Sequence, residues 1–251
     1  MDDLMKKHEM TEEDIKLQFI TPAIESAGWD KLKQIKMEFN FTDGRVIVRG
    51  NSTARGKKKR TDYLLYYKPN LPLAIVEAKD NNHSLGAGMQ QAIEYAEVLD
   101  IPFVYSSNGD GFLEHDMKSG KERELTLEQF PSPQELWQRH IGDEQFTPEQ
   151  EQLITEPYYF QPGDKTPRYY QRIAINRTVD AVARGQNRIL LVMATGTGKT
   201  YTAFQIIHRL WKSGRKKKIL FLADRNILVD QTMQQDFKPF AKVMTKIEGK
   251  K

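Results

Sequence analysis

Two carboxylates and a lysine lie on either side of a predicted turn. Asp62 precedes a short segment that contains two prolines and Asn70, and Glu77 and Lys79 follow it. Because proline and asparagine favour turns, the segment predicts a hairpin of two antiparallel strands. Asp62 lies eight residues before Asn70 and Glu77 lies seven residues after it. We therefore expect the hairpin to bring Asp62 alongside Glu77 and Lys79.

The second strand of this hairpin changes character along one face. Side chains two residues apart point to the same face of a strand, so Leu73, Ile75, Glu77 and Lys79 share one face that begins apolar and ends charged. Buried charges are costly unless they are paired or bind a ligand. Two carboxylates suit Mg²⁺, and a lysine beside them could act at an attacked phosphate. An ion pair of Lys79 with either carboxylate, here Asp62 or Glu77, remains the alternative.

A block of basic residues immediately precedes Asp62. It consists of Arg55, Lys57, Lys58, Lys59 and Arg60. Basic clusters suit the phosphate backbone of nucleic acids, although many lysine runs are only solvated loops. The position of the block would let it hold DNA over the carboxylates. We therefore predict that residues 57–60 bind DNA.

The hairpin residues resemble the signature of the PD-(D/E)xK nuclease superfamily. In that superfamily an aspartate starts one strand and Glu-x-Lys lies on the next, as do Asp62 and Glu77-Ala78-Lys79 here. Thr61 stands where the motif often has proline, and an upstream helix with Glu12 and Glu13 also fits the fold. The resemblance implies that Asp62, Glu77 and Lys79 are catalytic, and that Asp62 and Glu77 bind Mg²⁺.

A glutamine and a tyrosine follow one helix later. Gln91 and Tyr95 are four residues apart, which places them on one face of a helix. On its own this pair would indicate an ordinary half-buried tyrosine beside a solvated glutamine. After a Glu-x-Lys strand, however, it resembles an additional motif of nucleases that are fused to DNA motors. The resemblance implies that Gln91 and Tyr95 support DNA binding and cleavage.

A glycine-rich loop in the second half of the chain has the form of a Walker A phosphate-binding loop. It follows the apolar stretch 189–193, opens a predicted helix, and has Met193 in place of the first glycine. Its backbone amides would surround phosphates, Lys199 would reach the β and γ oxygens, and Thr200 would reach Mg²⁺. The residues predicted to bind ATP in this loop are Thr195, Gly196, Thr197, Gly198, Lys199 and Thr200.

The loop sequence Ala-Thr-Gly-Thr-Gly-Lys-Thr resembles motif I of superfamily-2 helicases and translocases. Upstream, Arg168-Tyr169-Tyr170-Gln171 is similar to their Q motif, which implies that Gln171 contacts the adenine edge with Arg168 nearby. Downstream, the segment 221–225 resembles motif Ia, which contacts DNA in these motors. No acidic Walker B motif follows the loop in this sequence. We therefore expect weak ATP binding without efficient hydrolysis.

Together the motifs predict an α/β fold with two domains. Residues 1–117 would form the nuclease-like α/β domain, 118–167 a proline-interrupted connector, and 168–251 the first part of a RecA-like domain with a parallel sheet. The predicted helices span 11–27, 86–99, 169–183, 199–211 and a stretch from about 227. The predicted strands span 35–41, 45–49, 63–67, 73–78, 102–106, 111–114, 189–193 and 219–223, with a turn at 42–44 joining the first two.

The amino-acid composition excludes several classes of protein. The 251 residues include no cysteine, which excludes disulfides, thiolate zinc sites and cysteine nucleophiles. The 39% of hydrophobic residues and 29% of charged residues fit a globular chain. No apolar run is long enough to span a membrane, and the first residues do not resemble a signal peptide. We therefore expect a cytoplasmic protein with no membrane partner.

A nuclease domain followed by a superfamily-2 motor is similar to the restriction (motor) subunit of type I restriction–modification enzymes, and the chain resembles an N-terminal fragment of it. This resemblance implies Mg²⁺ and ATP as cofactors, double-stranded DNA as substrate, and methyltransferase and specificity subunits as partners. A nuclease–helicase of type III restriction or DNA repair is one alternative. A DNA-binding or assembly module without catalysis is another.

Overall fold

The computed structural model describes residues 7–42, 46–49, 52–55, 58–142, 144–163, 165–224 and 226–247. The chain divides into two compact units, Met1–Gln145 and Phe146–Lys251, which are treated separately below. The domain boundaries predicted at residues 117 and 167 stay predictions. Within the described ranges, every helix is too short or too polar to cross a membrane.

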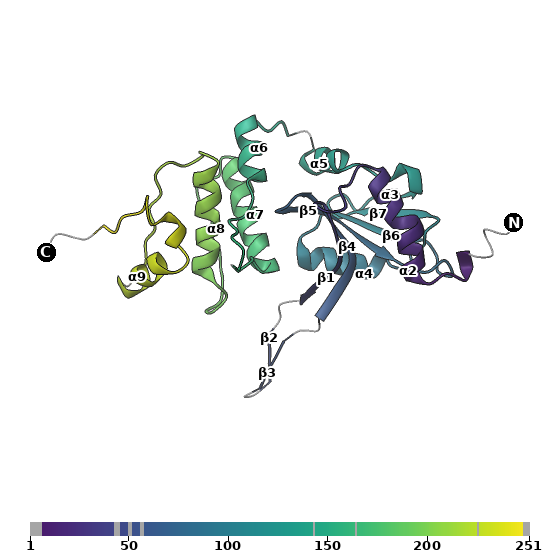
Figure 1. The fold of residues 1–251 in the computed structure, drawn as a ribbon, viewed down its shortest axis with the longest axis horizontal. Helices are drawn as coiled ribbons and strands as arrows, with labels where there is room; N and C mark the ends of the chain where they lie inside the picture. The colour runs from purple at the N-terminus through teal and green to yellow at the C-terminus, as the bar shows by residue number, and fades with distance from the viewer. Residues whose placement is uncertain are drawn as a thin grey trace. The chain divides into compact units, whose positions relative to one another are not determined.

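A mixed six-stranded sheet forms the centre of the first unit (Figure 1). Its strands, in spatial order, are β1 (Ile35–Thr42), β4 (Lys58–Lys68), β5 (Leu71–Ala78), β6 (Phe103–Ser107), β7 (Gly111–Asp116) and β8 (Glu122–Thr126). Neighbouring strands are antiparallel except β5 and β6, which run parallel. A parallel pair needs a crossover connection, and helix α4 (Met89–Leu99) supplies it. The predicted α/β class is confirmed.

The hairpin of β4 and β5 lies in the middle of this sheet. Tyr63 pairs with Val76 and Leu64 with Ile75, and these four side chains are buried. Neighbours on both edges and burial on both faces explain why the segments 63–66 and 73–76 are continuously apolar. The predicted hairpin and its antiparallel pairing are therefore confirmed.

The first long helical segment begins where the sequence indicates. Thr11 caps it: the Thr11 hydroxyl accepts from the backbone amide of Asp14, and the Asp14 carboxylate accepts from the amide of Thr11. The segment runs through α2 (Glu12–Ile15), a π-helical turn η1 (Lys16–Ile20) and α3 (Thr21–Ser26). π-helical turns are rare in proteins, and those that occur are often found at functional sites. In this chain the turn starts at Lys16, whose side chain is buried.

The strand pairing at one edge of the sheet differs from the prediction. β1 pairs with β4, whereas β2 (Val46–Arg49) pairs with β3 (Ser52–Arg55) in a separate two-stranded sheet. The predicted turn that was to join β1 to the next strand lies largely outside the described residues. Phe41 on β1 is buried in this arrangement. β1 therefore pairs with the long strand β4 and not with the strand that follows it in the sequence, as the turn had predicted.

Three further elements of the first unit lie in the segment predicted as a connector. Strand β8 extends the sheet by pairing with β7, and the short helix η2 (Leu127–Gln129) follows it. Helix α5 (Pro133–Ile141) then buries Leu136 and Trp137. The prolines at 131 and 133 mark the start of a packed helix here, because proline suits the first turn of a helix.

The second unit consists of helices. They are α6 (Pro148–Thr155), α7 (Tyr169–Ala183), α8 (Lys199–Lys212), α9 (Asn226–Gln234) and the short η3 (Lys238–Phe240). The predicted helices at 169–183 and from 199 are confirmed. The side chain of Arg209 on α8 is fully buried, and its guanidinium donates to the Ile154 carbonyl at the end of α6 and to Asn176 on α7. Arg209 thereby joins three helices.

The two strands predicted in the second unit are not formed. The segments 189–193 and 219–223 have no strand assignment, and Leu190, Val192 and Leu222 are 85%, 88% and 79% exposed. A buried parallel strand requires hydrogen-bonding neighbours. The described residues of this unit contain no strand that could supply them, so the predicted parallel sheet was wrong for these residues.

A buried carboxylate in the first unit makes stability depend on pH. Glu114 on β7 is 2% exposed and accepts hydrogen bonds from Tyr105, Arg123 and Arg139. Burial opposes the ionisation of Glu114, but the hydrogen bonds from Arg139 and Arg123 outweigh it and lower its pKa from 4.5 to about 2. A carboxyl group whose pKa is lower in the folded state than in the unfolded state stabilises the fold at pH values above its unfolded-state pKa. This stabilisation disappears as the pH falls through its folded-state pKa.

We therefore expect Glu114→Gln to lower the free energy of unfolding at neutral pH by about 3 kcal/mol. The difference between the variant and the wild type should shrink as the pH falls from about 4.5 towards about 2. Urea unfolding followed by circular dichroism at several pH values measures it. A difference that does not change with pH would contradict the assignment.

Candidate functional site

Asp62 in the middle of β4 and Glu77 near the end of β5 lie side by side. The pairing of Tyr63 with Val76 places Asp62 opposite Glu77, and opposite residues share a face of the sheet. The Asp62 side chain accepts a hydrogen bond of 2.9 Å from the amide of Ala78, and Glu77 accepts one of 3.4 Å from the amide of Asp62. The two residues are 7% and 1% exposed. The predicted juxtaposition is confirmed.

Lys79 lies at the end of the same strand face and is 23% exposed. Its Nζ is 3.8 Å from the Glu12 carboxylate on α2. The ion pair of Lys79 with Asp62 or Glu77, which was the alternative explanation of these charges, is not observed among the described residues. The ammonium that contacts Asp62 comes from Lys16 instead. Lys79 therefore lies at the exposed edge of the carboxylate pair, beside Glu12, one of the two helix glutamates noted in the sequence.

The sequence reasoning missed Lys16. The Lys16 side chain is 1% exposed, and its Nζ lies 2.5 Å from Glu13, 3.2 Å from Glu38 and 3.3 Å from Asp62. One signal was present: Lys16 is four residues before the buried Ile20, so both lie on one helical face. A lysine on the apolar face of a helix indicates a buried partner of opposite charge.

The surroundings of Glu77 disfavour its ionised form. Burial, together with the neighbouring Asp62 carboxylate, raises the pKa of Glu77 to about 8. Burial and Asp62 also raise the pKa of Glu12. Carboxylate oxygens that are short of positive charge suit a hard divalent cation. The donor set therefore fits Mg²⁺, although no group of three or more acidic, histidine or cysteine side chains among the described residues is arranged to hold a metal.

Helix α4 brings Gln91 and Tyr95 to the same place. Gln91 donates a 3.0 Å hydrogen bond to Glu77. Tyr95 is partly exposed, packs edge-on against Phe41, and has the Lys59 ammonium 5.5 Å from its ring centre. The helix comes this close because it begins at Gly88, where a Cβ would lie 3.1 Å from that of Glu77. Gln91 therefore contacts Glu77 directly, and Tyr95 follows it by four residues on the same helix.

The basic residues before Asp62 divide into several environments. Lys58 is exposed and Lys59 lies over Tyr95. Arg60 is 58% exposed and forms an ion pair with Glu38. Lys57 lies outside the described residues. Three cations with exposed side chains or aromatic contacts thus lie on the strand that leads to Asp62, and their role in DNA binding stays a prediction.

The phosphate-binding loop lies at the start of α8, as its sequence predicts. Gly198 precedes the helix with a φ of +81°, a left-handed conformation that favours glycine. The Lys199 ammonium lies 3.4 Å and 3.3 Å from the carbonyl oxygens of Met193 and Ala194. The N-terminus of a helix favours anions. The loop therefore has a suitable position for phosphate, with the lysine folded back onto it.

Gln171 joins the beginning of α7 to this loop. Its carbonyl oxygen accepts from the amide of Arg168 at 2.8 Å, and its NH₂ donates to the Thr197 carbonyl at 2.9 Å. The Tyr170 hydroxyl donates to the same carbonyl at 3.3 Å. A Cβ at Gly198 would lie 2.4 Å from the Gln171 amide nitrogen. Gln171 would have to give up one of these contacts to reach adenine, and that role stays a prediction.

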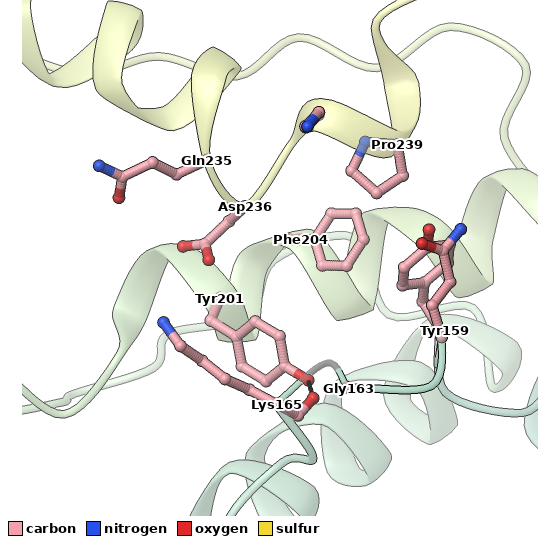
Figure 2. Close-up of a pocket in the computed structure, with 10 residues that line it drawn as sticks. Tyr159, Gly163, Lys165, Tyr201, Phe204, Gln235, Asp236 and Pro239 are labelled. Atoms are coloured by element: carbon pink, nitrogen blue, oxygen red, sulfur yellow. Dashed lines mark hydrogen bonds between the residues drawn. The ribbon is translucent and has the colours of Figure 1, made fainter.

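A cavity of about 650 Å³ lies beside α8 in the second unit (Figure 2). Tyr159, Tyr201 and Phe204 provide its aromatic lining, and Lys165 and Asp236 are among its polar residues. The Tyr201 hydroxyl donates to the Lys165 carbonyl at 2.5 Å. None of the residues predicted to bind ATP lines this cavity. Tyr201 nevertheless directly follows Thr200, so the cavity and the phosphate-binding loop share a helix.

Comparisons with known proteins agree with the two sets of motifs. Residues 30–131 match the family "Type I restriction enzyme R protein N terminus (HSDR_N)", and residues 164–251 match the family "Type III restriction enzyme, res subunit". The chain is 56% identical over 245 residues to the type I restriction enzyme EcoAI endonuclease subunit of Escherichia coli, covering 96% of this chain and 30% of that protein.

A second curated relative and a solved structure extend the likeness. The type I restriction enzyme EcoKI endonuclease subunit of Escherichia coli (strain K12) is 30% identical, with 71% of this chain and 19% of that protein covered. A fragment structure described as an HsdR subunit of a type I restriction enzyme from Vibrio vulnificus YJ016 is 45% identical. It covers 81% of this chain and 38% of that chain with a TM-score of 0.70.

The chain thus spans 30% or less of the length of these two curated relatives. Their common description favours the type I assignment over the type III alternative, although the second half matches a model named for type III enzymes. The chain belongs to the family of endonuclease subunits of type I restriction enzymes.

Proposed function

We propose that the first unit is a Mg²⁺-dependent DNA endonuclease with a PD-(D/E)xK type of site, and that the second unit carries the ATP-binding loop of a DNA translocase. The observation that carries the proposal is the buried pair of Asp62 and Glu77, with Gln91 bound to Glu77 and Lys79 at the rim. Three parts of the sequence contribute there the groups that phosphodiester cleavage needs.

Each residue has a distinct task in this proposal. Asp62 and Glu77 would hold Mg²⁺, which supplies Lewis acidity and a more acidic water when bound. Lys79 would stabilise charge on the attacked phosphate. Gln91 fixes the orientation of the Glu77 carboxylate through its 3.0 Å hydrogen bond. Lys59 and Tyr95 would contact the DNA backbone beside the carboxylates.

The second unit would bind ATP through its phosphate-binding loop. The N-terminus of α8 and Lys199 would neutralise the phosphates, and Thr200 would complete a Mg²⁺ site. Gln171 and Arg168 would lie on the adenine side, and the hydrogen bond from Gln171 to Thr197 would connect base recognition to the loop. In the whole enzyme this nucleotide would drive translocation along DNA. We expect little hydrolysis by the described units alone, since they lack a Walker B acidic residue.

The partners follow from the family rather than from the described residues. We propose that the whole subunit acts on double-stranded DNA together with methyltransferase and specificity subunits, in the cytoplasm where DNA and ATP are present. The test is cleavage of plasmid DNA in the presence of Mg²⁺, both with this chain alone and with the assembled enzyme. Cleavage that is unaffected by removing divalent cations with a chelator would refute the proposal.

The aromatic ring of Tyr95 gives a prediction that separates the two units. Tyr95→Ala is expected to lower the rate of DNA cleavage by about tenfold, because it removes the ring that supports Lys59 and packs on Phe41. ATP turnover in the assembled enzyme should change little. Tyr95→Phe keeps the ring and should retain most cleavage. The two rates are measured by plasmid nicking and phosphate release, and an equal fall in both would contradict a role specific to cleavage.

A further inference from the structure

Lys16 is a buried cation that holds carboxylates from three separate elements together. Glu13 lies in α2, Glu38 in β1 and Asp62 in β4, and all three carboxylates lie within 3.3 Å of the Lys16 ammonium. The lysine side chain is 1% exposed, so bulk water screens its charge from the carboxylates only weakly. Lys16 is therefore part of the site that surrounds Asp62 and Glu77.

The backbone at Glu38 supports this arrangement. Met37 pairs with Tyr63 and Phe39 with Thr61, so Glu38 stands opposite Asp62. Glu38 has a φ of +55°, a left-handed conformation that is unfavourable for a residue with a side chain and is found preferentially at functional sites. From this position its carboxylate contacts both Lys16 and Arg60. The strand thus accepts local strain and presents Glu38 to the lysine.

We infer that Lys16 is the resident counter-ion of the nuclease site, which neutralises Asp62 before a divalent cation arrives and passes to Glu13 and Glu38 when the cation binds. The inference rests on the proposed function, because it takes Asp62 as a metal ligand. Lys16 is a positioning residue in this account, since it acts through Asp62 and not on the DNA. It would set how tightly the site binds its metal.

The distances around Lys16 favour a movement of its ammonium from Asp62 to Glu13 and Glu38. The Lys16 ammonium is closer to Glu13 and Glu38, at 2.5 Å and 3.2 Å, than to Asp62, at 3.3 Å. Lys16 can therefore leave Asp62 and still have two anionic partners. A divalent cation bound by Asp62 would lie close to the ammonium, and like charges repel strongly in a partly buried site. Removal of the lysine charge should therefore strengthen metal binding, and removal of its alternative acceptor should weaken it.

The experiment measures binding of Mn²⁺ to the chain by electron paramagnetic resonance, in mildly alkaline buffer where protons compete least. Lys16→Met is expected to bind Mn²⁺ at least about tenfold more tightly than the wild type. Glu38→Gln is expected to bind it several-fold more weakly, because Lys16 then depends more on Asp62. Lys31→Met is the matched control, since Lys31 forms an exposed ion pair with Glu25 away from the site, and its affinity should equal that of the wild type.

The opposite directions of the two changes distinguish a counter-ion from a purely structural ion pair. A structural role predicts unchanged binding in both variants, or weaker binding in both. Unchanged or weaker binding by Lys16→Met would overturn the inference, and so would tighter or unchanged binding by Glu38→Gln, which decides the matter if Lys16→Met does not fold. Absence of Asp62-dependent Mn²⁺ binding in the wild type would overturn the proposed nuclease site as well.

Discussion

Asp62→Asn is expected to abolish Mg²⁺-dependent DNA cleavage, with a loss of at least about a thousandfold. The substitution removes the charge of the proposed metal ligand but keeps an oxygen that can accept the hydrogen bond from the amide of Ala78. The fold should therefore persist, which circular dichroism can confirm. Asp62→Ala should be equally inactive and less stable, because the amide of Ala78 then loses its acceptor. Plasmid cleavage by the assembled enzyme measures the activity.

The matched control for this experiment is Glu97→Gln on α4. Glu97 is exposed on the same helix as Gln91, so the variant removes one carboxylate charge without touching the site. It should cleave like the wild type. Calorimetric titration measures Mg²⁺ binding directly and does not depend on ATP-driven translocation. Metal binding or cleavage that persists at wild-type level in Asp62→Asn would exclude Asp62 as a ligand.

Lys199→Ala is expected to weaken nucleotide binding by about tenfold to a hundredfold. A charge-assisted hydrogen bond to phosphate contributes about 1.5–3 kcal/mol, and Lys199 is the cation of the phosphate-binding loop. Its contacts with the carbonyl groups of Met193 and Ala194 are long, at 3.4 Å and 3.3 Å, so the lysine can turn towards a ligand at small cost. Binding of a fluorescent ATP analogue to this chain measures the affinity.

Lys212→Ala provides the control for the loop. Lys212 is exposed in the last turn of the same helix α8, so the variant removes the same charge from the far end of the helix. Its affinity for nucleotide should be close to that of the wild type. A loss as large as that of Lys199→Ala would show that the effect comes from net charge rather than from contact with phosphate.

The parts of the site that could be predicted depend on local signals. The turn around Asn70 fixes the register that places Asp62 opposite Glu77, and helical spacing brings Gln91 to Glu77. Lys16 and Glu38 could not be assigned in this way. Their contacts with Asp62 and with each other depend on how η1 and β1 pack against β4, which no local pattern specifies.

The errors in the predicted fold have the same origin. The sequence of β1 resembles half of a local hairpin, yet its partner is β4. Strand β8 lies in the polar, proline-interrupted segment that predicts a connector, yet it pairs with β7. The apolar segments 189–193 and 219–223 have the composition of buried strands but lack neighbours in the described part of the second unit. Composition shows that a segment suits a strand, and only its partners make it one.

The same two apolar segments have a consequence for the behaviour of the chain in solution. Short uncharged stretches rich in isoleucine, leucine and valine are the kind from which identical chains stack into fibrils when the stretches are exposed. In this chain Arg188 stands directly before one stretch and Lys216, Lys217 and Lys218 before the other. Stacking in register would bring these like charges together, so they act as gatekeepers against self-association. We therefore expect the basic residues at 215–218 to oppose self-association of the chain without any bound ligand.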